Sequence, residues 1–366
     1  MKVLFVVSGI GYGDATRELS VIRKLLDKHP QTKIMVAGYD NSYEFFKNMF
    51  DTIKIKGYKL PGKRMKLSIL PFLFQNILLP VHWLFSMVKI KSKIKNFKPD
   101  IIISDFEPSG IAFARLVFKK CIVVFGYDPL TYKEFKKENK VSLKLRTEAL
   151  YFEKVYNRAN LVIIPKIFGK NSRDVSFPYI YVDSVVRQRP EELPDNKILM
   201  KKYKFEKRPI IVMMGGSKLG IQLAKNINNV ADKFNEHFII FGGECNFKLN
   251  NNITYIPFSF EFLEYLKISK GVITLGGQKT ISESLLFKKP LMLFPIRGHV
   301  EQVMNAYEAR EYSYLAKSYS AKEIAKEIKE FLKVQPALEH KLKKLKIETN
   351  GAKQIVKVIE TLAKKS

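Results

Sequence analysis

The chain has 366 residues and a formal net charge of +29, from 64 Lys and Arg against 35 Asp and Glu. Hydrophobic residues make up 46% and charged residues 27%, which excludes a largely disordered chain and predicts a sizeable core. At roughly 100–200 residues per domain, the length predicts two domains. Two cysteines, Cys121 and Cys245, exclude a disulfide framework and cannot alone form a zinc site, so we expect small buried residues in a reducing compartment.

The positive charge predicts an anionic partner: nucleic acid, anionic lipid or a phosphorylated substrate. Charge alone does not choose among them. The apolar run at residues 3–7 is too short for the core of a signal peptide. The chain also lacks a clean run of 18 apolar residues, so we expect no membrane-spanning helix.

Apolar runs alternate with long amphipathic segments along the first half of the chain. This alternation predicts βα units and a parallel sheet. The predicted strands are residues 2–7, 33–37, 100–105, 121–125 and 161–164.

The pattern restarts after a polar stretch at residues 187–196, which contains two prolines and is typical of a linker. The second half predicts strands at 209–214, 237–243, 253–256, 271–275 and 290–294, then helices at about 259–269, 278–288 and 299–311, with a lysine-rich helical tail over 321–366. The sequence therefore predicts an α/β protein with doubly wound domains at 1–186 and 197–366. Ligands of such sheets bind beyond the carboxyl ends of the strands, so we expect the active site in the cleft between the domains.

Three glycine-rich turns follow predicted strands. The first contains Gly9, Gly11 and Gly13, and its spacing departs from the dinucleotide fingerprint G-x-G-x-x-G. Such a turn lets backbone amides approach an anionic or sugar ligand, or it serves only tight strand–helix packing. The second, residues 215–220, lacks the Walker pattern but offers Gly216, Ser217 and a helix start to a diphosphate; a plain turn is the alternative.

The third turn, residues 276–283, carries the strongest signal because a second polar helix start follows at residues 295–302. Small residues and the Thr280 hydroxyl suit phosphate, and Glu283 suits the two hydroxyls of a ribose. Glu301 and Gln302 suit sugar hydroxyls. Taken singly, Glu283 is a solvated helix carboxylate; the repeated strand–loop–helix arrangement favours the binding site.

At these residues the sequence resembles the GT-B glycosyltransferases, most of all the group of the lipid-II-forming N-acetylglucosaminyltransferase of peptidoglycan synthesis. The resemblance spans both halves and is strongest over about 271–306. It implies two Rossmann-like domains, an acceptor-binding one followed by a nucleotide-sugar-binding one, around a cleft. It also implies an inverting, metal-independent transfer of a sugar, N-acetylglucosamine, from a UDP donor to a lipid-linked acceptor.

Carried over residue by residue, the resemblance implies roles at the donor site. Thr280 and Lys279 match positions near the donor phosphates. Glu283 matches the acid that binds the donor ribose. Glu301 and Gln302 match the pair of residues that recognises the donor sugar. Glu301 stands where the family has glutamine, so the transferred sugar stays open. The implied donor site comprises Arg187, Gly216, Ser217, Phe258, Gly277, Gln278, Lys279, Thr280, Glu283, Glu301 and Gln302.

For the acceptor side, the resemblance implies Gly11, Gly13 and Arg17. Asp14 stands where the family commonly has a histidine. A carboxylate can accept a hydroxyl proton, although a helix N-terminus stabilises its anion and weakens it as a base. The alternative is that Asp14 only caps the helix. Glu107 is the second candidate base, with a strand-end surface acid as its alternative.

We expect neither a metal nor a cofactor, the UDP-sugar being a substrate. Residues 105–107 are the nearest approach to a metal-binding D-x-D, but they lie in the acceptor half, and the five histidines show no ligand spacing. Helix N-termini, Ser217, Lys279 and Arg187 would instead meet the charge of the leaving diphosphate.

The most apolar segment, residues 67–88, contains two prolines and is flanked by lysines, so the region 63–95 is typical of a helix lying in an anionic membrane interface. A buried helix hairpin is the alternative. A second basic stretch, residues 133–146, adds to the same surface. We therefore expect a cytoplasmic protein bound peripherally to the cytoplasmic face of the membrane.

Three other functions stay open at this point. A nucleotide-sugar 2-epimerase on the same scaffold would need acid–base residues facing the donor sugar and no lipid surface. A nucleic-acid-binding protein is favoured by charge alone, since the basic residues are spread rather than gathered in an RNA-binding motif. A transferase scaffold that has lost activity would have Asp14 as its lesion.

Overall fold

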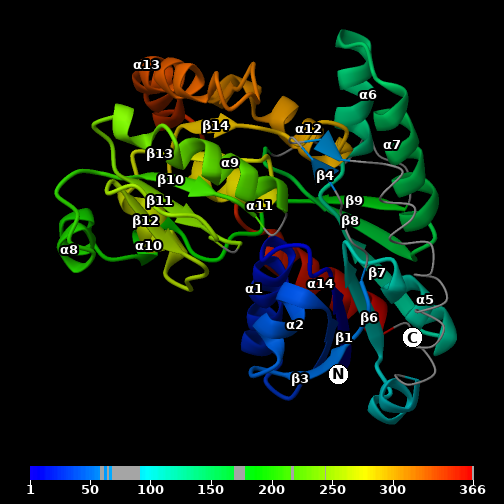
Figure 1. Cartoon of the computed structure of the whole chain (residues 1–366). Coiled ribbons are helices and arrows are strands. Elements are labelled where there is room, and N and C mark those ends of the chain that lie inside the picture. The colour runs from blue at the N-terminus through cyan, green and yellow to red at the C-terminus, as the bar shows by residue number, and fades with distance from the viewer. Residues whose placement is uncertain are drawn as a thin grey trace. The chain divides into compact units, whose positions relative to one another are not determined.

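The computed structural model describes residues 1–57, 62–63, 66–67, 91–168, 178–215, 218–243 and 245–364. The described residues form two compact units. The first takes those within Met1–Pro61, Ile69–Arg187 and Glu348–Ser366, and the second those within Gly62–Ser68 and Gln188–Ile347. Each unit is a parallel sheet flanked by helices (Figure 1).

The first unit holds a seven-stranded parallel sheet in the order β3-β2-β1-β6-β7-β8-β9. Its central strand β1 is buried along Val3–Val7, as expected for a strand covered on both faces. Its strands are β1 (Lys2–Val7), β2 (Lys33–Gly38), β3 (Asp51–Lys54), β6 (Ile101–Asp105), β7 (Lys120–Val124), β8 (Leu161–Pro165) and β9 (Tyr179–Val182). Its helices are α1 (Gly13–Lys28), α2 (Asp40–Phe46), α5 (Ser109–Leu116), α6 (Pro129–Glu138), α7 (Leu143–Tyr156) and α14 (Gly351–Ala363), and residues 91–97 are also helical.

The second unit holds a six-stranded parallel sheet in the order β12-β11-β10-β13-β14-β15. Its strands are β10 (Ile210–Met213), β11 (Phe238–Phe241), β12 (Ile253–Ile256), β13 (Gly271–Thr274), β14 (Leu291–Leu293) and β15 (Ser313–Leu315). Its helices are α8 (Asn196–Lys202), α9 (Lys218–Asn228), α10 (Phe262–Ile268), α11 (Gln278–Leu286), α12 (Val300–Glu308) and α13 (Ile324–Lys343). Short 3-10 turns lie at Pro190–Glu192, Ala231–Lys233 and Arg310–Tyr312, and a two-stranded antiparallel pair joins β4 (Gly62–Lys63) to β5 (Lys66–Leu67).

Alternate side chains of the second sheet enter its two covering layers. Ile210, Val212 and Ile240 pack with α9 and α13 in one cluster. On the other face, Phe241 meets Phe262 of α10 edge to face, with ring centroids 5.1 Å apart. Both sheets are therefore doubly wound, as the sequence predicts.

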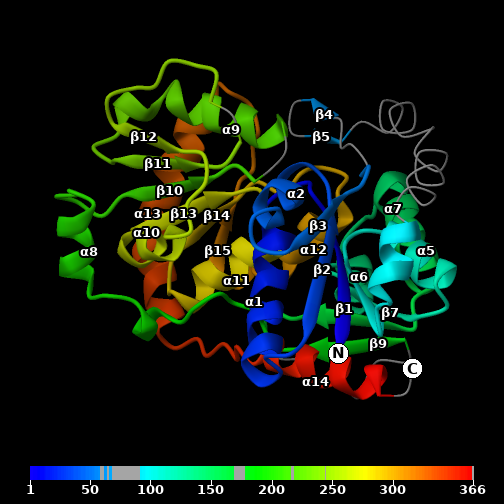
Figure 2. The ribbon, with the colours of Figure 1, turned by 90° about the horizontal axis from the view of Figure 1, so that it is seen from below.

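The last helix, α14, belongs to the first unit, whereas the sequence interpretation extended the second domain to residue 366. Its apolar face, with Ile355 and Ile359 buried, needs a partner surface, and α14 lies beside α1 (Figure 2). Lys28 of α1 pairs with Glu360, Nζ to Oε1 at 2.7 Å. A Cβ on Gly351 would lie 2.1 Å from the carbonyl oxygen of Asp183, so only glycine allows this approach.

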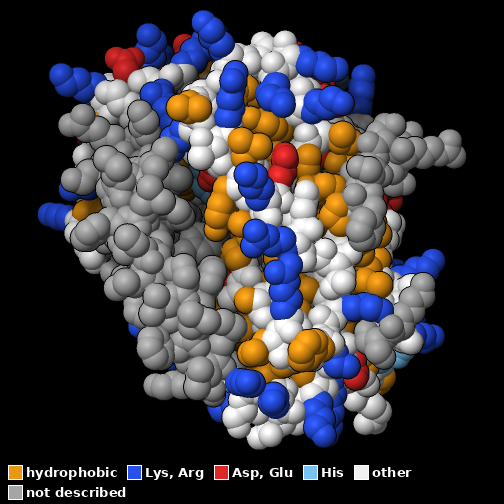
Figure 3. Space-filling view, turned by 90° about the vertical axis from the view of Figure 1, so that its right-hand side faces the viewer, with side chains coloured by type: hydrophobic (Ala, Val, Ile, Leu, Met, Phe, Trp, Pro, Cys, Tyr) orange, Lys and Arg blue, Asp and Glu red, His pale blue; other side chains and the backbone are white. Residues whose placement is uncertain are grey.

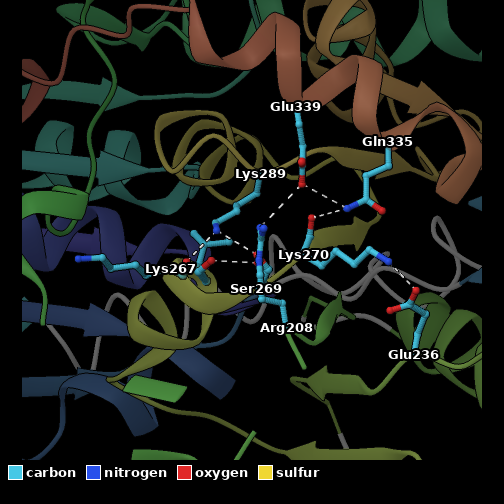
Figure 4. Close-up of polar contacts among 9 residues, drawn as sticks. Arg208, Glu236, Lys267, Ser269, Lys270, Lys289, Gln335 and Glu339 are labelled. Atoms are coloured by element: carbon cyan, nitrogen blue, oxygen red, sulfur yellow. Dashed lines mark hydrogen bonds and ion pairs between the residues drawn. The ribbon is translucent and has the colours of Figure 1, made fainter. Parts of the chain in front are cut away.

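A polar network ties the amino-terminal edge of the second sheet to α10 and α13 (Figure 4). The buried Lys289 donates from Nζ to the carbonyl oxygens of Lys267 at 2.7 Å and Ser269 at 2.9 Å, at the end of α10. Arg208 also donates to Ser269, at 2.7 Å, and Gln335 of α13 donates to the carbonyl of Lys270 at 2.8 Å. Burial, with the nearby Arg208, lowers the pKa of Lys289 to about 7.

The cysteines match the expectation in part. Cys121 is buried, and burial raises the pKa of its thiol to about 12. Cys245 is half-buried. Among the described residues, no helix is both long and apolar enough to span a bilayer.

Candidate functional site

In the first unit the strand order reverses between β1 and β6, and the loops that leave these strands form a ligand crevice in doubly wound sheets. The first glycine-rich turn follows β1, and Asp105 ends β6. Since β1 and β6 are parallel, Asp14 at the start of α1 and Glu107 after β6 lie at the same edge of this sheet. Both candidate bases are thus at the edge where the sequence placed them.

Arg17 connects the two sides of this crevice. Its guanidinium donates to Asp105, Nε to Oδ2 at 2.8 Å and a terminal nitrogen to Oδ1 at 2.5 Å. The same terminal nitrogen donates to Asp14 Oδ1 at 2.8 Å. Arg17 is only 4% exposed, so it anchors this edge of the sheet, and its charge is paired with two carboxylates.

Asp14 is not a helix cap. Tyr12 occupies the N-cap position of α1 without a side-chain capping bond, and Asp14 lies within the first turn. The Asp14 side chain is 24% exposed, so solvent and ligand reach it. Asp14 therefore combines access with a fixed, charge-paired position.

Glu107 is buried, unlike the surface acid that was its alternative. Its Oε1 accepts from the backbone N–H of Ser109 at 3.2 Å. Burial raises the pKa of Glu107 to about 7, while the hydroxyls of Ser109 and Tyr39 oppose this shift. Because Glu107 has no exposed surface in this structure, Asp14 is the better placed base.

Two buried neighbours of this edge were not anticipated from the sequence. The Tyr39 hydroxyl lies 3.2 Å from Ser8 Oγ, and a Cβ on Gly9 would lie 1.9 Å from the carbonyl oxygen of Tyr39. Gly9 thus serves packing against Tyr39, whereas Gly11 and Gly13 are partly exposed. Glu18, the other neighbour, is buried beside Asp105, and burial together with that carboxylate raises its pKa well above the ordinary range.

A second polar cluster at the same edge is fully paired. Lys166 donates from Nζ to Asp128 Oδ2 at 2.6 Å, and Thr131 and Tyr181 donate to the same carboxylate. Burial opposes ionisation of Asp128, but Lys166 and the hydroxyls outweigh it and lower its pKa to about 2. This arrangement stabilises the first turn of α6, where Asp128 also accepts from the N–H of Leu130 at 2.9 Å.

In the second unit the strand order reverses between β10 and β13. Gly276 follows β13 with a φ of 106°, and Gly277 is the N-cap of α11. A Cβ on Gly277 would meet nothing within 4 Å, so there is open space beside the N-cap of α11. A helix N-terminus that opens at a switch point fits a phosphate group.

Glu283 lies further along α11 and is 1% exposed. Lys279 lies one turn before it, 8% exposed, with Nζ 3.3 Å from Glu283 Oε1. The pair places side by side a cation and a carboxylate, the groups that the sequence led us to expect for phosphate and for ribose hydroxyls. Glu283 is therefore not a solvated helix carboxylate, the alternative to the ribose-binding role that the sequence led us to expect.

The helix that follows β14 supports the same edge. Asn305 of α12 donates to the carbonyl oxygen of Gly276 at 3.2 Å. Gln302 accepts from the backbone N–H of Ile296 at 3.0 Å through its Oε1, which leaves the amide nitrogen as the group that can meet a sugar. Glu301, its neighbour, is partly exposed.

The remaining predicted donor residues are spread over the chain. Phe258 follows β12, an edge strand, and stacks edge to face on Phe260 at 5.0 Å. Arg187 is half-buried at the end of the first unit. Gly216 and Ser217 lie outside the described residues, as does nearly all of the apolar segment 67–88. Within the described ranges, no group of three or more His, Cys, Asp or Glu could hold a metal ion.

Comparisons with known proteins agree with this geometry. A family model described as "Glycosyl transferase family 1" matches residues 1–336. An uncharacterized glycosyltransferase of Methanosarcina acetivorans is 24% identical over 98% of both chains. A UDP-N-acetylglucosamine--N-acetylmuramyl-(pentapeptide) pyrophosphoryl-undecaprenol N-acetylglucosamine transferase of Exiguobacterium sibiricum is 22% identical over 79% of this chain and 78% of that protein.

Solved structures show the same fold. A UDP-glucosyltransferase from Polygonum tinctorium matches with a TM-score of 0.65 and 14% identity, over 99% of this chain and 98% of that one. The glycotransferase of kitacinnamycin matches with a TM-score of 0.64 and 14% identity, over the same shares of the two chains. The two Rossmann-like units are therefore those of the GT-B fold, which confirms the fold class expected from the sequence.

Proposed function

The chain belongs to glycosyl transferase family 1, and we propose that it transfers N-acetylglucosamine from UDP-N-acetylglucosamine to a lipid-linked acceptor with inversion and without a metal. Its activity as a glycosyltransferase follows from the family; the donor, the acceptor and the mechanism are the proposal. The observation that carries it is α11, where the open N-terminus at Gly277 and the buried Lys279–Glu283 pair offer a phosphate and a ribose site on one helix.

In this mechanism the diphosphate lies at the start of α11, with amides and Lys279 to stabilise the charge that develops as UDP leaves. Asp14 removes the proton of the acceptor hydroxyl, and the acceptor oxygen attacks the anomeric carbon on the face opposite to UDP. One carbon–oxygen bond forms as the bond to the diphosphate breaks, so the configuration inverts. Arg17 and Asp105 hold Asp14 at the sheet edge throughout.

The lipid-linked acceptor is supported by the activity of the Exiguobacterium sibiricum relative and by the basic, partly apolar surface of the first unit. These features also support peripheral attachment to the cytoplasmic face of the membrane. The comparisons do not favour an epimerase or a nucleic-acid-binding protein.

The test is a product analysis. The purified chain is incubated with a panel of UDP-sugars and a membrane lipid extract, with the Glu283→Gln variant as a matched control, and products are identified by mass spectrometry. We expect an N-acetylhexosamine added to a lipid and an anomeric configuration opposite to that of the donor. A free 2-epimer formed without lipid, or a product only from another donor, would overturn the proposal.

A further inference from the structure

Helix α7 of the first unit is apolar on two opposite sides. Leu145, Ala149, Phe152 and Tyr156 are buried against the unit, at helical spacing. The other side carries Leu143, which is 80% exposed, and Leu150, which is 56% exposed. A surface helix of a globular protein normally has one apolar stripe, so a second exposed stripe requires a separate explanation.

The exposed stripe of α7 is interleaved with cations. Arg146 and Lys154 are exposed, and their positions, three and eleven residues after Leu143, put them on the side of Leu143 and Leu150. The preceding helix α6 and its loop add exposed lysines, among them Lys133, Lys137 and Lys140. Residues 129–158 contain eight basic and four acidic side chains.

Figure 3 shows the face on which α6 and α7 lie. Hydrophobic side chains gather along it, Lys and Arg side chains lie between them, and acidic side chains are few. The mixture differs from a solvated basic face, because large aliphatic side chains there project into solvent.

The helices that form this surface start at the carboxyl edge of the first sheet. α6 begins five residues after β7 ends at Val124, at the edge that carries Asp14 and Glu107. Partial burial, with the carboxyl of Glu107 as a second cause, raises the pKa of Tyr151 on α7. A partner on this surface would therefore sit beside the candidate acceptor site.

We propose that the α6–α7 surface, formed by Lys133, Lys137, Lys140, Leu143, Arg146 and Leu150, docks on an anionic lipid bilayer. Leu143 and Leu150 enter the acyl boundary, and the cations meet anionic headgroups. A nucleic acid would use the cations but not the exposed leucines, and the positive charge of this face disfavours a second copy of it. The inference deepens the proposed function, because it places the acceptor site at the surface that supplies a lipid-linked acceptor.

The test measures binding of the purified full chain to sonicated vesicles without any nucleotide sugar. Cosedimentation compares phosphatidylcholine vesicles with vesicles that also contain phosphatidylserine, at low and high salt. We expect tighter binding with phosphatidylserine and weaker binding at high salt, because screening acts over about 10 Å at 0.1 M. The Lys133→Gln/Lys137→Gln/Lys140→Gln variant should lose about tenfold or more in affinity. The Leu143→Ser/Leu150→Ser variant should lose about tenfold on both vesicle types.

Matched controls separate the surface from general charge and apolarity. Phe118→Ser removes a side chain that is 94% exposed and precedes β7 at the opposite edge of the sheet, and it should leave binding unchanged. Lys197→Gln/Lys201→Gln/Lys204→Gln removes three exposed lysines of the second unit and should cost less than the α6 variant. All variants are checked for unchanged thermal unfolding.

Three results would overturn the proposal. If the leucine variant keeps the vesicle affinity of the wild type while both lysine variants lose affinity, the protein has a general surface for polyanions. A dimer in analytical ultracentrifugation that the leucine variant dissociates would assign the stripe to a second copy. If vesicle binding is lost only when Trp83 and Phe85 are replaced, the membrane contact belongs to the apolar segment 67–88 instead. Failure of sugar transfer with intact vesicle binding would contradict the proposed function and leave this surface standing.

Discussion

Arg17 donates two hydrogen bonds to the carboxylate of Asp105, from Nε to Oδ2 at 2.8 Å and from a terminal nitrogen to Oδ1 at 2.5 Å. These bonds join the start of α1 to the end of β6, although Arg17 and Asp105 are 88 residues apart in the sequence. Burial opposes the charge of Arg17, but the carboxylates of Asp105 and Asp14 outweigh it and raise its pKa. Asp14 therefore lies at the crevice as part of a preformed ionic group.

The first prediction concerns Asp14 as the base. Asp14→Asn keeps the size and a hydrogen bond with Arg17 but cannot take a proton. We expect turnover to fall by about 10²–10⁴-fold, with UDP affinity and thermal stability nearly unchanged. Asp27→Asn, an exposed acid on the same helix, is the matched control and should retain full turnover. Turnover near that of wild type would remove Asp14 from the mechanism, and a strong gain in Asp14→His would mark it as an attenuated form of the family's histidine.

The second prediction concerns the buried acid Glu107. Its pKa is raised to about 7 in the folded chain, so the folded state holds a proton that the unfolded state has lost between about pH 4.5 and pH 7. The wild type therefore loses stability as the pH rises through this window, by at most about 1.4 kcal/mol per pH unit. Glu107→Gln, which mimics the protonated form, should lack this slope and be the more stable protein above pH 7.

Urea unfolding of wild type and Glu107→Gln across this pH range measures the difference. Turnover of Glu107→Gln should stay within a few-fold of wild type, because Glu107 is buried and Asp14 is the accessible candidate base. Parallel stability curves for the two proteins would contradict the raised pKa. A loss of turnover as large as that of Asp14→Asn would instead make Glu107 catalytic.

Much of the fold follows from continuous apolar runs in the sequence. Strands such as β1 and β6 are covered on both faces, so their hydrophobic residues are unbroken and easily recognised. In the two parallel sheets, the strands that the sequence does not predict are β3, β9 and β15, which lie at sheet edges. Edge strands are short and partly exposed, so their pattern is weak.

The parts of the candidate site that could be predicted are those whose residues lie close together in the sequence. Glu283 and Lys279 are four residues apart on one helix, and their spacing alone places them together. The Arg17–Asp105 ion pair and the contact of Tyr39 with Ser8 depend on which strands are neighbours in the sheet. The local sequence does not determine that order. The placement of α14 in the first unit is likewise a long-range outcome, since its apolar face fits more than one partner surface.

The third prediction concerns the donor site. Glu283→Ala would leave Lys279 without this carboxylate in a buried position, so Glu283→Gln is the sharper variant. We expect a loss of about 1–3 kcal/mol in UDP binding, because a charged hydrogen bond to the ribose is weakened. Glu206→Gln, an exposed acid that precedes β10 at the other edge of the same sheet, serves as the control. Titration calorimetry that gives equal UDP affinities for all three proteins would remove Glu283 from the donor site.

The fourth prediction concerns metal. In the proposed mechanism the amides at the start of α11 and the Lys279 cation stabilise the leaving diphosphate. Transfer should therefore survive excess EDTA, while Lys279→Gln should lower turnover more than UDP affinity. Activity that chelator abolishes and magnesium or manganese restores would show that an ion, rather than Lys279, carries this charge.

The last prediction concerns Lys289 and the stability of the second unit. Its pKa is lowered to about 7, so between about pH 7 and its ordinary value near 10.4 the unfolded chain binds a proton that the folded chain does not. Stability therefore rises with pH across this window, by at most about 1.4 kcal/mol per pH unit from this group. A neutral amine has two N–H groups, which match its two bonds to the carbonyl oxygens of Lys267 and Ser269. Lys289→Met should lack this rise, so the free energy of unfolding of the wild type increases relative to that of Lys289→Met as the pH increases. Lys204→Met changes an exposed lysine and should show the same pH dependence of stability as the wild type. Urea unfolding at several pH values measures the difference, and equal slopes for wild type and Lys289→Met would show that the buried amine is charged throughout.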